Sequence, residues 1–205
     1  MSLDTHKYGY TLKGSSVVLF RTNALRQSMY FCYADWTGGL YTTATLAGSR
    51  SGGLIAQCWA SMMTMGEEGY TENVRAILDE TQIVAAGINK IDGLRLMGNP
   101  DAMIVAFGTK DHESLNVYAV GDKMHAKGWS LNSLQKPPSI HLCLTVKHVG
   151  KGQEFLEDLA ESVAEVRANP GEKSSSAALY GATSALPPGP VADVLKVYND
   201  VVLNL

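Results

Sequence analysis

The residues best suited to covalent chemistry lie near the start of the sequence, within residues 4–10. A lysine amine on a short loop beside a histidine, here Lys7 next to His6, is what a Schiff-base site needs. Partial desolvation or a nearby cation would make that amine more nucleophilic. Lys13 would serve as such a cation or as a phosphate ligand. Most lysines are solvated surface charges, so composition alone does not assign chemistry to Lys7.

A glycine-rich stretch over residues 35–53 holds the other candidates for a binding site. Gly38 and Gly39 would let backbone amides approach an anion closely. Arg50 suits an anionic group because its guanidinium makes paired hydrogen bonds, and a structural ion pair is the alternative. Tyr41 is either a site residue or an apolar anchor of the loop. The stretch lacks the strand, loop and helix context of a P-loop.

Composition excludes several classes of protein. With 45% apolar and 18% charged residues among 205, the chain is expected to fold around a hydrophobic core. Its net charge of -3 makes nucleic acid an unexpected partner. Three cysteines are too few for a disulfide framework, and the five histidines have no metal-ligand spacing. No apolar run approaches the roughly 18 residues of a membrane-spanning helix.

The elements that must position these candidates fall into two parts, with a domain boundary expected near Gly66. Residues 1–66 predict strands over 16–21 and 30–33, followed by an extended loop over 35–53. A nearly uninterrupted apolar run over 54–65 predicts a helix that is buried on most sides. Gly66 is expected to end or kink that helix.

Residues 67–205 predict a small α+β domain, with a sheet covered on one face by helices. Strands are expected over 94–97, 103–107 and 140–146, the first two as antiparallel neighbours. Amphipathic helices are expected over 67–91, 115–127, 153–168 and 191–205. Residues 171–190 are expected to be loosely ordered, and the acidic side chains of 153–168 to be solvated. His141 is expected to be half-buried with its hydrogen bonds satisfied.

The chain carries seven short motifs, which in chain order are DTHKYGY (4–10), KGSS (13–16), YADWTGGLY (33–41), AGSRSGG (47–53), CWA (58–60), KGW (127–129) and QKPPSIH (135–141). Together these motifs resemble the sphingosine-1-phosphate lyases, which belong with the amino-acid decarboxylases to the fold-type-I pyridoxal-phosphate enzymes. Ser51 stands where the lyases usually carry proline. Because order and spacing hold along almost all of the chain, the lyases are favoured over the decarboxylases.

The resemblance implies a fold and a set of site residues. The fold is α/β overall, with the C-terminal remnant of a fold-type-I large domain (1–66) followed by an α+β small C-terminal domain (67–205). Lys7 would form the Schiff base with pyridoxal 5'-phosphate, and Lys13 would assist phosphate binding or proton transfer. The implied catalytic residues are Lys7, Lys13 and Tyr41. The implied cofactor-binding residues are His6, Lys7, Gly38, Gly39, Ser49 and Arg50.

The resemblance also implies a reaction and partners. The reaction is cleavage of a sphingoid base 1-phosphate into a long-chain aldehyde and phosphoethanolamine, a step of sphingolipid breakdown. The glycine-rich loop of this family reaches the active site of the neighbouring subunit, so a homodimer is expected. The expected location is cytoplasmic, or the endoplasmic reticulum membrane for a full-length eukaryotic parent. An amino-acid decarboxylase and a non-catalytic piece that only folds or dimerises remain alternatives.

The position of Lys7 near the first residue carries a further expectation. Family members carry a phosphate-cradling loop, a ring-stacking histidine and a ring-nitrogen aspartate before the lysine, and none precedes Lys7 here. The chain is therefore expected to be a C-terminal fragment, a truncated gene product or one piece of a split chain, and to be inactive without the missing part. Residues 17–20 are expected to expose apolar surface for the same reason.

Overall fold

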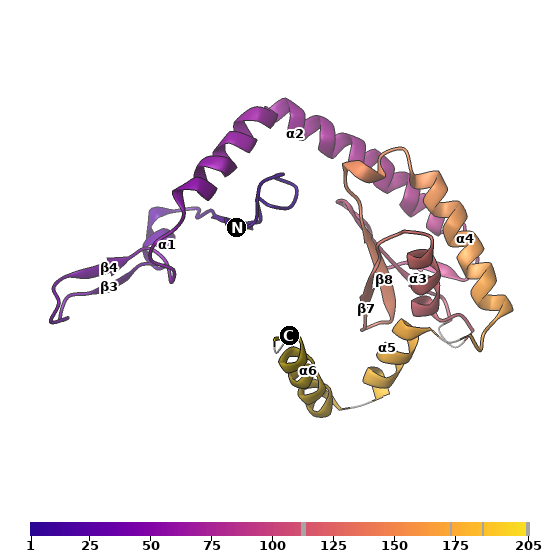
Figure 1. The fold of residues 1–205 in the computed structure, drawn as a ribbon. Helices are drawn as coiled ribbons and strands as arrows, with labels where there is room; N and C mark the ends of the chain where they lie inside the picture. The colour runs from indigo at the N-terminus through magenta and orange to yellow at the C-terminus, as the bar shows by residue number, and fades with distance from the viewer. Residues whose placement is uncertain (112–113, 173, 186, 204–205) are drawn as a thin grey trace. The chain divides into compact units, whose positions relative to one another are not determined.

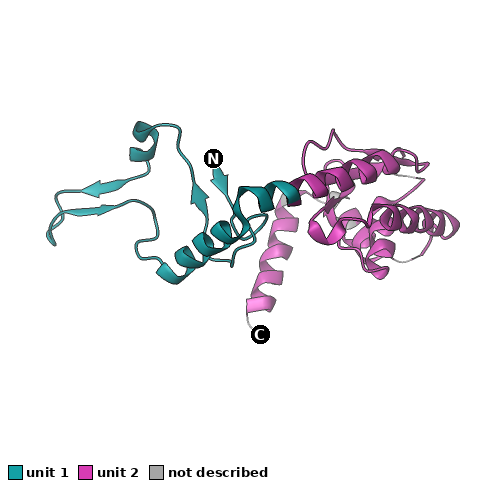
Figure 2. Ribbon diagram, turned by 90° about the horizontal axis from the view of Figure 1, so that it is seen from above, with its two compact units in different colours: residues 1–72 teal, residues 73–205 magenta. Residues whose placement is uncertain are grey.

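The structure, a computed structural model, describes residues 1–111, 114–172, 174–185 and 187–203. It divides into two compact units, residues 1–72 and 73–205, which Figure 2 shows in different colours. The division falls within one long helix, α2 (Gly52–Ile88), which also contains the boundary expected at residue 66. Residues 204 and 205, part of the expected last helix, lie outside the described residues.

The first unit is built from short elements. β1 (Ser2–Leu3) pairs antiparallel with β2 (Val17–Val18), and β3 (Phe31–Tyr33) pairs antiparallel with β4 (Tyr41–Thr43). The five-residue helix α1 (Asn23–Gln27) lies between these two pairs. The strand expected over 16–21 is only two residues long, because β2 has only the two residues of β1 to pair with. The stretch expected to be an extended loop contains β4, which pairs with the aromatic residues of β3.

Apolar side chains of the first unit are largely exposed. Val18 and Leu19 are exposed as expected, while Val17 and Phe20 are half-buried. The prediction that the helix over 54–65 is buried on most sides is wrong, since Trp59 is 65% exposed. An apolar run of this kind is buried only where other elements cover it, and the described part of the first unit leaves most of it uncovered.

Gly66 bends α2, as the sequence predicts. Its backbone has φ 61° and ψ 176°, a conformation that essentially only glycine adopts. A Cβ atom at Gly66 would meet nothing within 4 Å, so the backbone conformation and not the available space requires glycine. The kink divides α2 into a segment that carries Gln57 and a segment that carries Tyr70.

The second unit is a four-stranded antiparallel sheet with helices packed on it (Figure 1). The strand order is β5 (Leu94–Leu96), β6 (Ile104–Thr109), β8 (Ser139–Cys143) and β7 (Asn132–Leu134). The other elements are α3 (Val117–Ala126), the 3-10 helix η1 (Val146–His148), α4 (Gly152–Ala168), α5 (Ser175–Ala185) and α6 (Pro188–Leu203). This confirms the expected α+β organisation and the antiparallel pairing of β5 with β6. β7 is not foreseen, because its Asn-Ser-Leu sequence has little strand propensity.

Aromatic rings form the centre of the second unit. Phe155 of α4 contacts Phe107 of β6 and Trp129 edge-on, with ring centroids 6.5 and 5.1 Å apart. Ile140 and Leu142 of β8 are buried in the same core. The amphipathic pattern over residues 153–168 therefore predicts correctly both the helix and the face that it buries.

A helix occupies part of the stretch over 171–190 that is expected to be loosely ordered. The Asp122 carboxylate accepts a hydrogen bond of 2.6 Å from the Ser174 hydroxyl, just before α5. Tyr180 of α5 stacks on Tyr118 of α3, with ring centroids 4.9 Å apart. The prediction that this stretch is loosely ordered is therefore wrong for α5. Contacts from Asp122 and Tyr118 order this helix, which its composition does not predict.

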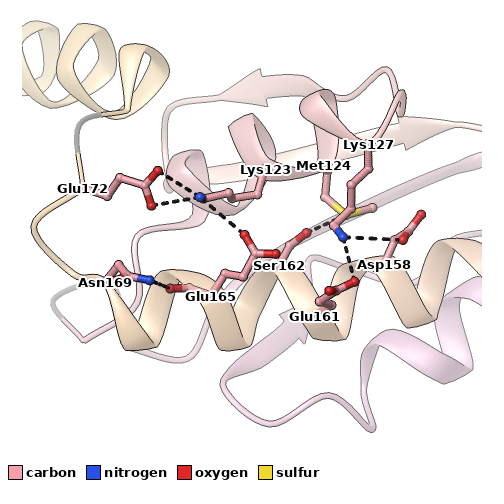
Figure 3. A network of polar contacts seen from close by, with 9 residues as sticks. All are labelled: Lys123, Met124, Lys127, Asp158, Glu161, Ser162, Glu165, Asn169 and Glu172. Carbon is pink, nitrogen blue, oxygen red and sulfur yellow. Dashed lines mark hydrogen bonds and ion pairs between the residues drawn. The ribbon is translucent and has the colours of Figure 1, made fainter.

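The acidic face of α4 is largely exposed, as expected, with Glu161 63% exposed, although Asp158 is half-buried. Three of its carboxylates pair with Lys123 of α3 and with Lys127, the residue directly after α3 (Figure 3). Lys127 Nζ lies 2.7 Å from a Glu161 oxygen and 3.8 Å from an Asp158 oxygen. Lys123 Nζ lies 3.4 Å from a Glu165 oxygen. The hydrogen bond with Glu161 raises the pKa of Lys127. These lysines and carboxylates neutralise one another and join α3 to α4, so they are structural and not candidates for chemistry.

Candidate functional site

Lys7 lies on a tight turn between β1 and β2. Its backbone N–H donates to the Asp4 carbonyl over 3.1 Å, and its own carbonyl accepts from the Tyr10 N–H over 3.2 Å. Thr11 N–H donates to the Thr5 carbonyl over 3.2 Å and closes the turn. Tyr10 adopts φ 56°, in the left-handed region that bulky residues rarely occupy. This turn presents the Lys7 side chain at the surface, 63% exposed.

The amine of Lys7 forms an ion pair with Asp4, with 2.8 Å between Nζ and Oδ2. The hydrogen bond from Lys7, together with its charge, lowers the pKa of Asp4 below the ordinary value. Within the described residues Lys7 is therefore exposed and paired with an anion, and its assignment to covalent chemistry stays a prediction. The ammonium group must lose a proton before the amine acts as a nucleophile, and the contact with Asp4 favours the protonated form.

Replacing Asp4 with asparagine is expected to make Lys7 more reactive toward a small aldehyde at pH 7. The substitution removes the anion that stabilises the ammonium form of Lys7. Exposed ion pairs of this kind change the ratio of protonated to free amine by about 1.5- to 5-fold. Reductive methylation with formaldehyde and cyanoborohydride, read by peptide mass spectrometry, measures the rate at Lys7. Lys196 is an internal reference, because it pairs with Asp193 at the same spacing and distance. An unchanged ratio of Lys7 to Lys196 labelling would show that Asp4 does not protect the amine.

His6 carries a buried nitrogen atom, Nδ1, that has no hydrogen-bond partner among the described residues. An unpaired buried polar atom is costly, so such an atom is a place where a ligand or a further residue would be accommodated. His141 Nδ1 on β8 is in the same state, so the expectation that His141 is satisfied is wrong within the described residues. Of the two histidines, only His6 adjoins the candidate lysine Lys7.

Gly38, Gly39 and Tyr41 lie at the tip of the β3–β4 hairpin, which Figures 1 and 2 show extended away from the rest of the first unit. The Trp36 ring meets the Tyr41 ring edge-on at 5.8 Å. A Cβ atom at Gly38 would approach the Trp36 ring to 2.7 Å, and Gly39 has φ 111°. Both glycines are therefore required by the hairpin turn itself. The structure does not bring these three residues to Lys7 within the unit.

The remaining predicted site residues are exposed on loops of the first unit. Ser49 and Arg50 lie just before α2, and Lys13 lies between the Lys7 turn and β2. Arg50 Nη2 donates to the Thr45 hydroxyl over 2.6 Å, a hydrogen bond within its own loop. The predicted site residues are therefore spread over the Lys7 turn, the β3–β4 hairpin and the loop before α2.

Two residues of α2 that the sequence does not single out hold the turn. The Tyr70 hydroxyl donates to the Gly9 carbonyl over 2.8 Å, and its ring stacks on that of Tyr10 with centroids 6.2 Å apart. The Gln57 side-chain oxygen accepts from the Leu12 N–H over 3.0 Å. No periodicity marks these residues, because each contact joins positions far apart in the sequence.

Within the described ranges, no group of three or more histidine, cysteine, aspartate or glutamate side chains is arranged to hold a metal ion. The part of the chain that the structure describes also contains no helix with the length and hydropathy needed to cross a bilayer.

Curated proteins similar to this chain are sphingosine-1-phosphate lyases. The protein of Dictyostelium discoideum is 45% identical over 189 residues, which is 91% of this chain and 35% of the relative. The protein of Arabidopsis thaliana is 44% identical over 202 residues, which is 98% of this chain and 37% of the relative. The chain thus spans little more than a third of the length of these relatives. No family model matches the chain.

Solved structures similar to this chain are also pyridoxal-phosphate enzymes, and one of them is a sphingosine-1-phosphate lyase. A sphingosine-1-phosphate lyase of Burkholderia pseudomallei matches with a TM-score of 0.74 and 38% identity, over 82% of this chain and 38% of that one. A glutamate decarboxylase of Lactobacillus brevis matches with a TM-score of 0.64 and 19% identity, over 81% of this chain and 40% of that one, and shows the fold alone. This chain is a homologue of the C-terminal portion of the sphingosine-1-phosphate lyases and has the fold of that portion.

Proposed function

We propose that this chain supplies the cofactor-attaching lysine and the C-terminal domain of a pyridoxal-phosphate-dependent carbon–carbon lyase. Its substrate class is the sphingoid base 1-phosphates, which the reaction cleaves to a long-chain aldehyde and phosphoethanolamine. The observation that carries this proposal is the match to the Arabidopsis thaliana lyase over 98% of the chain. The unmatched 2% is about four residues of 205, so the match includes Lys7.

The residues around Lys7 fit pyridoxal phosphate. When bound, this cofactor supplies an aldehyde carbon that reacts with amines and a ring that withdraws electrons from the bond to be broken. Lys7 offers a primary amine on a turn fixed by backbone hydrogen bonds. His6 offers a nitrogen atom without a partner for a phosphate oxygen. Lys13, exposed and cationic, attracts the phosphate group electrostatically.

The hairpin residues act in the site of a second copy in this proposal. Gly38, Gly39 and Tyr41 lie on the β3–β4 hairpin, which extends away from the rest of the first unit, so a homodimer is the assembly in which they reach a cofactor. The tip also exposes apolar side chains, Leu40 and Trp36 among them. Exposed apolar groups on a projecting hairpin are suited to burial against a partner. Ser49 and Arg50, on the loop between the hairpin and α2, are assigned to anion binding in the same assembly.

A chimera tests the proposed reaction directly. Residues 1–205 replace the matching portion of the Dictyostelium discoideum lyase, and the product is loaded with pyridoxal phosphate. With a sphingoid base 1-phosphate, the expected products are a long-chain aldehyde and phosphoethanolamine in equal amounts. The unmodified relative is the positive control.

The alternatives predict different products from the same chimera. An amino-acid decarboxylase would release carbon dioxide from glutamate or an aromatic amino acid and no aldehyde from the lipid. A piece that only folds or dimerises would give a stable chimera that produces neither. The identity of 38% to the lyase structure, against 19% to the decarboxylase structure, favours the lyase outcome.

A further inference from the structure

The turn that carries Lys7 is attached to α2 on both sides of the Gly66 kink. Tyr70, on the C-terminal side, holds the Gly9 carbonyl, and Gln57, on the N-terminal side, holds an amide three residues further along the turn. We propose that Tyr70 is a positioning residue that fixes where the Lys7 amine lies. This proposal rests on the proposed function only in assigning cofactor attachment to Lys7.

The backbone carbonyl that the Tyr70 hydroxyl bonds lies close to Lys7 in the chain. Gly9 lies two residues after Lys7, and the next residue, Tyr10, donates its N–H to the Lys7 carbonyl. The loop closes tightly, because a Cβ atom at Gly9 would collide with the Thr5 carbonyl oxygen. Residues 5–9 therefore form a compact loop. A displacement of the Gly9 carbonyl moves the backbone that carries the Lys7 side chain.

Tyr70 makes its two contacts with different parts of the turn. Its hydroxyl bonds the backbone at Gly9, while its ring stacks on Tyr10, whose φ of 56° is strained for a bulky residue. The stacking contributes to holding Tyr10 in this conformation. Burial raises the pKa of the Tyr70 hydroxyl, with smaller contributions from Cys58 and Tyr10, so the hydroxyl stays protonated and remains a donor at neutral and moderately alkaline pH.

The kink at Gly66 contributes to making this double attachment feasible. Thirteen residues separate Gln57 from Tyr70, which corresponds to about 20 Å along a straight helix. Gly9 and Leu12, their partners, are at most about 11 Å apart along the chain. The bend in α2, together with the lengths of the two side chains, makes up the difference between the span of the helix and the shorter span of the turn. Tyr70 and Gln57 therefore contact the turn from opposite sides of the kink.

The test uses the 205-residue chain without cofactor and the variant Tyr70→Phe, which keeps the ring and removes the hydroxyl. Hydrogen exchange of the peptide covering residues 4–14 is expected to become about three- to tenfold faster, the effect of losing one hydrogen bond. Reductive methylation of Lys7, relative to Lys196, is expected to become at least about twofold faster, because the loosened turn no longer holds the amine against Asp4.

Tyr118→Phe is the matched control. The Tyr118 hydroxyl donates to the Leu134 carbonyl over 2.6 Å, so this variant loses the same kind of hydrogen bond in the second unit. It is expected to lower thermal stability without changing exchange over 4–14 or the labelling of Lys7. If Tyr70→Phe leaves both readouts at their wild-type values, Tyr70 does not position Lys7. A chimera that takes up no pyridoxal phosphate would instead overturn the proposed function and leave these two readouts unaffected.

Discussion

Arginine at position 7 is expected to abolish attachment of pyridoxal phosphate to the chimera and to reduce lyase activity on the order of 10³-fold or more, the effect of removing an essential nucleophile. Arginine keeps the positive charge and the ion pair with Asp4, but its guanidinium group stays protonated and does not form the covalent bond. The measurement is the near-visible absorbance of the loaded protein, together with aldehyde release. Attachment is mapped by borohydride reduction and mass spectrometry.

Lys196→Arg is a closely matched control for this substitution. Lys196 pairs with Asp193 three residues earlier at 2.8 Å, the geometry that Lys7 has with Asp4, and it is similarly exposed. This variant is expected to keep full absorbance and activity. A Lys7→Arg chimera that retained the absorbance would assign cofactor attachment to another lysine and remove the central residue of the proposed site.

Mixing two inactive chimeras tests whether the hairpin completes the site of a second copy. A dimer of one Lys7→Arg chain and one Tyr41→Ala chain has one site with an intact lysine and an intact tyrosine, provided that Tyr41 acts across the interface. Random pairing then restores about a quarter of the wild-type activity. If Tyr41 acts within its own subunit, every site of the mixed dimer lacks one residue and the activity stays low.

The parts of the fold that the sequence predicts well are those determined by local chemistry. The period of apolar residues over 153–168 determines α4, and the backbone needed at Gly66 determines the kink. The assignment of Lys7 to cofactor attachment likewise starts from a local motif, residues 4–10, and stays a prediction. In each case the information lies within a few neighbouring residues.

The parts that the sequence does not predict depend on distant partners. The apolar helix over 54–65 looks buried from its own residues, but burial requires a covering element that the described first unit does not supply. α5 forms in a stretch of small residues because Asp122 and Tyr118, from another helix, contact it. Tyr70 contacts the Lys7 turn across a separation of 61 residues. Periodicity carries no information about such a contact.

Replacing Glu80 with alanine is expected to destabilise the second unit by about 2–5 kcal/mol, since a buried and a part-buried backbone donor would both lose their partner. Glu80 of α2 is 7% exposed. Its carboxylate accepts from the Gly150 N–H over 2.5 Å and from the Gly152 N–H over 2.6 Å, at the start of α4. Lys151, at the N-cap position, makes no side-chain cap, so Glu80 supplies the cap from a different helix.

The charge of Glu80 adds to this effect, since a carboxylate at the N-terminus of a helix interacts favourably with the helix dipole. Glu80→Gln keeps an oxygen acceptor and loses the charge, so its loss of stability is expected to be smaller than that of Glu80→Ala. Glu157→Ala is the control on α4, because Glu157 is exposed and accepts a hydrogen bond from the Gln153 side chain on the same helix. Its effect is expected to stay within about 0.5 kcal/mol.

Urea unfolding followed by the fluorescence of Trp129 measures these differences. Trp129 is buried in the second unit and donates its indole N–H to the Asp158 carboxylate over 2.7 Å, whereas Trp36 and Trp59 are exposed. The change in the Trp129 signal therefore reports on the core that α4 completes. If Glu80→Ala unfolds at the same urea concentration as Glu157→Ala, the start of α4 does not depend on Glu80. The docking of α4 on α2 would then rest on apolar contacts such as Leu156 against Gly87, where a Cβ atom would collide with the leucine.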